Sequence, residues 1–452
     1  MENKYLLIIA GSVVFLLLVA SIIYAVVRRG GGEEQQQTTD PVTITIWRLF
    51  DEEDAFQPIF DQYKSDHPNV TIVYEKKDVA DYEEVFTNAI AGGKGPDILS
   101  LPNDWLVKHK DKLIAAPETV MKLEEYQEQF VEIANNDAVI DNQIYGMPLY
   151  TDSLALYYNS EITGDALVRL REANPGGDLS AQQLLLTRPP TNWTDLIEAV
   201  KLITQRNGND VTVAGIAMGT AETTLNSAAI LQALMLQNGS TMTNVDRSAA
   251  SFHLPSETQT GKQYFPGTEA LDFFTAFAKT DRTVYNWNDR MGSSLEAFMN
   301  KKAAMMINFK YVQQDLRQRA PTLRFDVAPL PQIKGPTNPP ANVASYMVET
   351  VTKDADNPDV AWGLVKHMAN PSQVASYRTV TRRTSAIRRQ VEGGSDPFAI
   401  GIENAKSVYK PDAKKYDDSF REMIRAVVDL RQPPQTAIDV AANKVTQLLL
   451  GQ

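Results

Sequence analysis

The residue types that carry nucleophilic catalysis and tight metal binding are scarce in this chain of 452 residues. Cysteine is absent, which excludes disulfides, thiolate metal sites and a thiol nucleophile. No two of the histidines have the spacing of paired metal ligands on one helix face; they are His67, His109, His253 and His367. Neither a G-x-S-x-G elbow nor a GxxxxGK[ST] phosphate loop occurs. The sequence therefore predicts no catalytic residue, no metal site and no bound cofactor.

Two features near the start of the predicted domain could contact a ligand. Trp47 ends the first predicted strand, where a cleft is expected to open, although its ring could equally pack in the core. The acidic run from Asp51 to Asp54 lacks the glycine-centred spacing of a calcium loop. Its charges could stabilise the N-terminus of the next helix, or its carboxylates could bind ligand hydroxyl groups.

The net charge of the chain argues against a nucleic-acid partner. Lys and Arg number 44 and Asp and Glu 56, so the formal charge is −12. Such a chain repels phosphate backbones, and we expect no nucleic-acid partner. A hydrophobic share of 43% and a charged share of 22% are typical of folded domains, and the length fits two or three of them.

The N-terminal segment predicts a membrane anchor over residues 1–27. Tyr5 to Val27 carries no charged side chain and exceeds the roughly 20 apolar residues that span a bilayer. No A-x-A site follows it, so a cleaved signal peptide is the second interpretation. Residues 28–41 hold no large apolar side chain and predict a flexible linker. Arg28 and Arg29 by themselves favour a cytoplasmic domain.

Strand and helix patterns alternate at the start of the domain. Strands are predicted at 42–47, 70–74 and 97–101, with helices over 56–63 and 81–93 between them. This alternation is typical of an α/β fold with a parallel sheet covered on both faces. The middle is more helical, and Asn192 is expected to cap a helix that continues to residue 204. Two amphipathic stretches, 421–430 and 436–450, complete the chain.

Seven sequence blocks occur in one order over most of residues 42–370. They are TITIWR (43–48), AIAGGKGPDILSL (89–101), YGMPLYTDSLALYYN (145–159), RPPTNWTDLIEAVKLIT (188–204), AGIAMG (214–219), AFMNKKAAMMIN (297–308) and DVAPLP (326–331). In these blocks the chain resembles the extracellular solute-binding proteins of ABC importers, especially the class that binds maltose and other oligosaccharides. Members of that class are commonly anchored to the membrane through a lipidated cysteine or are free in the periplasm. This chain has no cysteine and has the hydrophobic N-terminal segment instead.

The resemblance implies a two-lobed, periplasmic-binding-protein-like α/β fold with a hinge and a ligand cleft between the lobes. Lobe 1 would comprise residues 42–150 and 328–372, and lobe 2 would comprise 153–325 and 376–452. The chain would cross between lobes at Leu149–Ala155, at Phe325–Pro329 and after Asn370-Pro371. The family also places the domain outside the cytoplasm, and we weigh this above the charges that follow the anchor.

The resemblance also implies ligand-binding residues. The acid that follows GPDI in the maltose-type binders corresponds to Asp104, with Trp105 beside it, and the acid of the first crossing corresponds to Asp152. The aromatic residue after the AMMIN block corresponds to Tyr311. Leu99 to Leu101 stand where a stacking aromatic is expected, which argues against maltodextrin itself. As alternatives, Asp152 could be a hinge cap, Tyr311 a packed surface ring and Trp105 a helix-face anchor.

Together these features predict a monomeric protein, attached to the cell membrane by one helix, with its large domain outside the cytoplasm. It would bind a small solute, a carbohydrate by preference, and deliver it to the permease subunits of an ABC importer. Two alternatives stay open: an anchored receptor that signals, and an exported carbohydrate-active enzyme that uses two carboxylates.

Overall fold

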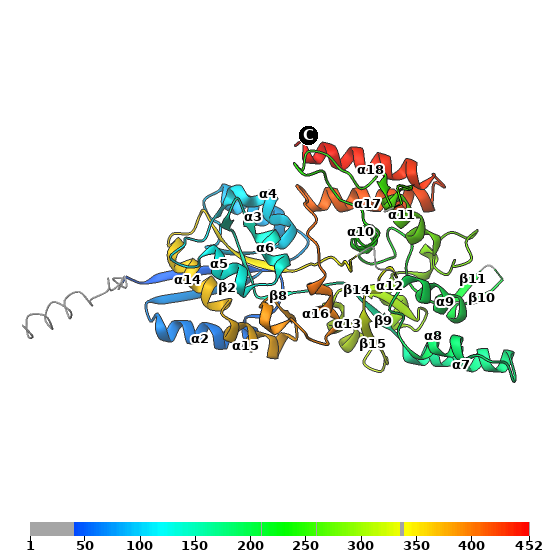
Figure 1. Cartoon of the computed structure of the whole chain (residues 1–452). Coiled ribbons are helices and arrows are strands. Elements are labelled where there is room, and N and C mark those ends of the chain that lie inside the picture. Colours follow the sequence, from blue (N-terminus) through cyan, green and yellow to red (C-terminus); the bar gives the residue numbers. More distant parts are fainter. Residues whose placement is uncertain (1–39, 209, 259, 335–338, 452) are drawn as a thin grey trace, which may run out of the picture.

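The computed structural model describes residues 40–208, 210–258, 260–334 and 339–451, which form two lobes (Figure 1). The predicted anchor and residues 28–39 of the predicted linker lie outside the described residues. Within the described part, no helix has the length and apolar character that a membrane crossing requires.

The sheet of lobe 1 is built from the strands that the alternating pattern predicted, joined by one strand from later in the chain. Its order is β2 (Val70–Lys76), β1 (Val42–Arg48), β3 (Ile98–Pro102), β16 (Met347–Thr352) and β4 (Leu113–Ile114), with β7 (Met147–Pro148) also paired to β16. β1 is parallel to β2 and β3, whereas β16 is antiparallel to β3, β4 and β7. The parallel arrangement is therefore confirmed for the first three strands and wrong for β16, which enters from the other lobe.

Helices pack around this sheet because its strands are apolar on both faces. In β16 all six residues are buried, and in β3 the first four are. The helices of lobe 1 are α2 (Gln57–Asp66), α3 (Tyr82–Ala91), α4 (Leu106–His109), α5 (Leu123–Gln129), α6 (Glu132–Ala138), α14 (Pro358–Met368) and α15 (Pro371–Thr381). A short hairpin, β5 (Val139–Ile140) and β6 (Gln143–Ile144), follows α6.

Lobe 2 is organised around a three-stranded antiparallel sheet. β9 (Ala155–Tyr158) lies between β14 (Met305–Asn308) and β15 (Asp326–Pro329). Because side chains alternate along a strand, Leu156 joins one hydrophobic core and Tyr157 a second core on the opposite face. Two small hairpins complete the strands of this lobe: β10 (Gln205–Asn207) with β11 (Asp210–Val213), and β12 (Ser256–Glu257) with β13 (Gln263–Tyr264).

The helices of lobe 2 enclose this sheet. They are α7 (Ser160–Ala173), α8 (Ser180–Thr187), α9 (Trp193–Ile203), α10 (Ser227–Gln237), α11 (Pro266–Ala276), α12 (Ser294–Met299), α13 (Val312–Arg319), α17 (Ala413–Val428) and α18 (Pro434–Leu449). The predicted cap of α9 is confirmed, since Asn192 Oδ1 accepts a hydrogen bond of 3.0 Å from the amide of Asp195. The two amphipathic stretches near the C-terminus lie in α17 and α18 except for their last one or two residues, and the two helices pack on each other.

The first crossing between the lobes lies where the sequence places it. β8 (Tyr150–Thr151) pairs with β17 (Thr384–Ser385), and Tyr150 belongs to the core of lobe 1. The chain then enters the lobe-2 sheet at β9, shortly after β8. Ser153 forms a bridge with Ala344, so the second crossing runs beside the first.

The second and third crossings differ from the predicted ones. β15 pairs along its whole length with β9, so Phe325–Pro329 does not leave lobe 2. The chain crosses between Val343, in a lobe-2 core, and Tyr346, in the lobe-1 core. Residues Tyr377 to Ala405 still contribute to the lobe-1 core, whereas Tyr416 belongs to lobe 2. The third crossing therefore lies after Ala405, well beyond its predicted place, and α16 (Pro397–Glu403) packs between the lobes.

Candidate ligand-binding site

A cavity of about 910 Å³ lies between the two lobes. Lobe 1 contributes Asn103, Asp104 and residues of α6 and β5, and lobe 2 contributes Asn226 and other residues on and after α10. The third crossing, from Lys406 to Lys410, lines it as well. Ligand pockets commonly measure roughly 300–1,000 Å³, so this cavity has room for a small organic ligand.

Asp104 takes part in an ion-paired group that joins the lobes. Asp104 follows β3 at the carboxyl end of the strand, on the cavity wall. Its Oδ2 lies 3.2 Å from Nζ of Lys410, and the same ammonium lies 3.0 Å from Oδ1 of Asp417 on α17. Burial raises the pKa of Asp104, although the charge of Lys410 opposes that rise. Burial would lower the pKa of Lys410, but Asp417 and Asp104 raise it above its usual range, so this lysine stays charged.

Further hydrogen-bonding groups surround this ionic group. The carboxylate of Asp137 accepts hydrogen bonds from Asn103 Nδ2 (2.9 Å) and Tyr346 Oη (2.7 Å). On the opposite wall, Asn226 Nδ2 donates to Asn308 Oδ1 (2.8 Å) and to Tyr311 Oη (3.1 Å). The cavity therefore presents amides and carboxylates from both lobes, which suits a ligand with several hydroxyl groups.

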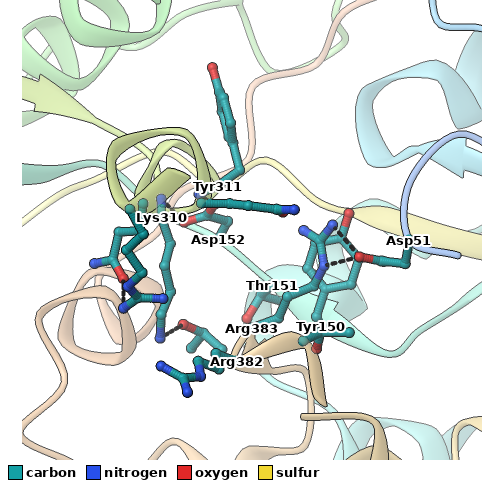
Figure 2. A pocket seen from close by; sticks show the side chains of 13 residues that line it. Asp51, Tyr150, Thr151, Asp152, Lys310, Tyr311, Arg382 and Arg383 are labelled. Carbon is teal, nitrogen blue, oxygen red and sulfur yellow. Dashed lines mark hydrogen bonds and ion pairs between the residues drawn. The ribbon is translucent and has the colours of Figure 1, made fainter. Parts of the chain in front are cut away.

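A second, smaller cavity of about 70 Å³ also has walls from both lobes. Two predicted residues, Asp152 and Tyr311, line it together with Asp51, Lys310 and Arg383 (Figure 2). Arg383 Nη2 donates to Asp51 Oδ1 over 3.0 Å. The positive charge of Arg383 holds the pKa of Asp51 below its ordinary value, although burial acts in the opposite direction. The acidic run at Asp51 thus reaches the lobe junction through its first residue.

Asp152 and Tyr311 touch each other instead of facing each other across a cleft. Asp152 is 5% exposed, and its carboxylate accepts backbone hydrogen bonds from Ser153 (2.8 Å), Lys310 (2.8 Å) and Tyr311 (3.1 Å). Burial raises the pKa of Asp152 to about 7, against the effect of these amides. The acid thereby ties the first crossing to the segment before α13, which agrees with the hinge-cap interpretation. Tyr311 is 47% exposed, and its ring is directed away from the Arg383–Asp51 pair (Figure 2).

Among the described residues, no group of three or more His, Asp or Glu could hold a metal ion.

The sequence model of the bacterial extracellular solute-binding proteins matches residues 50–375, which is most of the chain. The chain belongs to this family. Its members are binding proteins, and the resemblance seen in the seven sequence blocks is confirmed.

Relatives of the chain in this family are distant. A binding protein from Brucella abortus (strain 2308) is 21% identical over 310 residues, which cover 68% of this chain. That match spans 66% of the relative's own length, just under two thirds. The solved structure of the cyclic alpha-maltosyl-1,6-maltose binding protein from Arthrobacter globiformis has a TM-score of 0.73 at 18% identity, over 91% of this chain and all of that one. The sugar-binding protein MalE from Xanthomonas citri has a TM-score of 0.69 at 17% identity, over 90% and 98%. These structures share the two-lobed fold.

Two predicted ligand residues of this family member lie away from both cavities. Trp47 is 9% exposed and packs in the lobe-1 core, with Nζ of Lys77 3.8 Å from its ring centroid. Trp105 packs against the same core, 6.3 Å from Phe86 between ring centroids. The prediction that Trp47 opens into the cleft is therefore replaced by the core interpretation, because both faces of this sheet are covered. Trp105 likewise fits the helix-face interpretation.

Other site residues escaped the sequence prediction. Lys410 was missed because the third crossing was placed too early, and nothing in its local sequence marks it. Arg383 was missed because its partner Asp51 is 332 residues earlier in the sequence, before α2. Asn226 has a positive φ of 59° without being a glycine, which only the folded structure reveals.

Proposed function

We propose that this family member captures a carbohydrate in the large interlobe cavity and passes it to an ABC importer. The observation that carries the proposal is the cavity of about 910 Å³, with hydrogen-bonding side chains from both lobes. A ligand held by both walls would favour the closed arrangement of the lobes, and a permease could recognise that arrangement. No bond chemistry is required of the protein in this role.

The lining of the cavity supports a polyol as ligand. Carboxylates such as Asp104 accept hydrogen bonds from hydroxyl groups, and amides such as Asn226 and Gln232 both donate and accept. Tyr311 offers an exposed ring that could contact the apolar face of a sugar. The names of structural neighbours support the same class, since they include proteins bound to tagatose and to maltose.

We further propose that the hydrophobic N-terminal segment holds the domain at the outer surface of the cell membrane. The proposal rests on the uncharged segment from Tyr5 to Val27 and the polar linker, together with the extracellular character of the family. Protease treatment of intact cells should then degrade the domain, and full protection of the domain would contradict this orientation.

Titration calorimetry of the full chain against a panel of neutral and acidic mono- and oligosaccharides tests the binding proposal. At least one carbohydrate should bind, and Asp104→Asn should weaken it by about 1.5–3 kcal/mol through loss of a charged acceptor. Asp61→Asn is the matched control, because Asp61 is exposed on α2 and lines neither cavity. Binding by none of the panel would overturn the proposal.

A further inference from the structure

The smaller cavity is basic in a chain that is acidic overall. Four cationic side chains line it, from Lys310, Arg317, Arg382 and Arg383, against the carboxylates of Asp51 and Asp152. The cations come from both lobes. In lobe 2, Lys310 precedes α13 and Arg317 lies on it, and in lobe 1, Arg382 and Arg383 follow α15. This surplus contrasts with the formal charge of −12 for the whole chain. We call this cavity the basic pocket.

Both carboxylates of the basic pocket already have their partners. Asp51 accepts from Arg383 through Oδ1 (3.0 Å) and from Tyr377 Oη through Oδ2 (2.6 Å). The two carboxylate oxygens of Asp152 accept hydrogen bonds from three backbone amides. An anion that enters the pocket would therefore meet carboxylates whose charge is already compensated.

Two of the cations have no carboxylate partner within the described part of the chain. Arg317 donates to Gln313 Oε1 over 3.1 Å and makes no ion pair there. Arg382 has neither a side-chain hydrogen bond nor an ion pair among the same residues, and its side chain is exposed. Lys310 is shared between Asp396 (2.7 Å) and Thr384 Oγ1 (3.2 Å), and Arg383 lies over the ring of Tyr150. The unpaired donors at the pocket are thus guanidinium groups, which match oxyanions in geometry.

The backbone at Arg382 is also unusual. Arg382 ends α15 with φ of 58°, in the left-handed region that glycine or asparagine usually occupies at this position. Figure 2 shows Arg382 and Lys310 among the side chains that line the pocket, arriving from different segments of the chain.

We propose that the basic pocket binds a phosphate-sized oxyanion. Its volume of about 70 Å³ exceeds what a single water molecule needs and leaves room for such a group. Guanidinium groups bind phosphate and carboxylate through two parallel hydrogen bonds, so Arg382 and Arg317 are the expected contacts.

The pocket adjoins the large cavity. Tyr311 lines the basic pocket, and its hydroxyl accepts a hydrogen bond from Asn226, which lines the large cavity. Phe309, two residues earlier, lines the large cavity too. The oxyanion could therefore belong to an acidic sugar whose ring occupies the large cavity, a refinement that rests on the proposed function, or it could be free inorganic phosphate. The chemistry at the pocket is the same in both cases.

Titration calorimetry of the full chain with inorganic phosphate, glucose 6-phosphate and glucose tests the proposal. At least one of the two phosphates should bind at millimolar concentration, and rising salt should weaken it. The double variant Arg317→Gln/Arg382→Gln should bind it about tenfold more weakly or worse. Arg389→Gln is the control, because Arg389 is exposed nearby and does not line the pocket.

The comparison of probes identifies the source of the anion. Glucose 6-phosphate that binds much more tightly than both phosphate and glucose makes the oxyanion part of an acidic sugar, whereas equal binding of the two phosphates makes the pocket a site for the free anion. Either result supports the pocket. Failure of both phosphates to bind, or binding that the double variant leaves unchanged, overturns it. Melting curves confirm that each variant is folded. A chain that binds the two phosphates equally and binds no other carbohydrate would refute the proposed function and leave the pocket standing.

Discussion

The large interlobe cavity and the basic pocket both have walls from the two lobes, but their chemistry differs. The lining of the large cavity carries as many acidic as basic side chains, and Lys410 pairs there with both Asp104 and Asp417. In the basic pocket the carboxylates are compensated while Arg317 and Arg382 have no carboxylate partner in the described chain. The first arrangement suits a neutral ligand with many hydroxyl groups, and the second suits an anion.

This difference indicates how one junction could select a composite ligand. Neutral hydrogen-bonding groups recognise the shape and hydroxyl pattern of a sugar, and each contact contributes modestly. Arg317 and Arg382 add discrimination by charge, because only a ligand with an anionic group gains charged hydrogen bonds from them. Substitutions in the two cavities should therefore have separable effects.

The largest expected effect follows from removing the central cation of the large cavity. Lys410→Met would leave Asp104 and Asp417 facing each other without their shared partner. Breaking a fully buried ion pair costs about 3–5 kcal/mol, and because this group is partly buried the loss should approach that range from below. Urea denaturation should show the loss. Lys406→Met is the control, since Lys406 is exposed on the same segment and lines the same cavity. Equal stability of the two variants would mean that the ionic group does not join the lobes.

The next effect concerns the acid of the basic pocket. Burial raises the pKa of Asp152 to about 7, so the folded chain keeps a proton that the unfolded chain releases near its ordinary pKa of about 3.9. The folded state therefore binds more protons between these values, and the free energy of unfolding should fall as pH rises through this window. At about 1.4 kcal/mol per pKa unit, the contribution of this group is at most about 4 kcal/mol.

Denaturation of the native chain and of Asp152→Asn at a series of pH values measures this contribution. The asparagine variant, which is a neutral isostere of the protonated acid, should lack the part of the slope that Asp152 supplies. It should therefore lose less stability than the native chain as pH rises toward 7. Parallel slopes in the two proteins would show that Asp152 does not titrate in this range.

A smaller effect is expected at Tyr311, which connects the two cavities. For a neutral carbohydrate that binds the native chain, Tyr311→Ala should cost about 2 kcal/mol of affinity, because an exposed aromatic contact is removed. Tyr311→Phe keeps the ring and loses only the hydrogen bond from Asn226, so it should cost about 0.5–1.5 kcal/mol. Native affinity in the alanine variant, by calorimetry, would exclude Tyr311 from the site.

The smallest effect on binding is expected at Trp47. Since its ring lies in the lobe-1 core, Trp47→Phe should lower the melting temperature and leave the affinity for carbohydrate and for phosphate unchanged. A tenfold loss of affinity with an unchanged melting temperature would indicate that Trp47 contacts the ligand after all.

Local sequence patterns predict several strands and helices, and one motif indicates a residue that lines the large cavity. β1 and β2 follow from alternating apolar residues, the start of α9 follows from the Asn192 cap, and Asp104 follows from its position after GPDI. The crossings were harder, because a strand such as β15 has the same local pattern whichever lobe it joins. Pairing with β9 decides its lobe, and that partner lies much earlier in the chain, before α7.

The basic pocket could not be predicted for a related reason. Asp51, Lys310 and Arg382 come from three segments that are far apart in the sequence, and none of them belongs to a local motif. Burial also reassigned residues whose types alone suggested ligand contact, as Trp47 shows. Residue type indicated which chemistry was available, but only the packing of the two lobes determined which side chains meet.

A crystal structure of the chain with the carbohydrate that binds it most tightly would test the central claim most directly. We expect the sugar to occupy the cavity between Asp104 and Asn226, with hydrogen bonds to side chains of both lobes. If the ligand carries an anionic group, that group should lie against Arg382 and Arg317. A sugar bound to one lobe alone, or outside the interlobe cavity, would contradict the account.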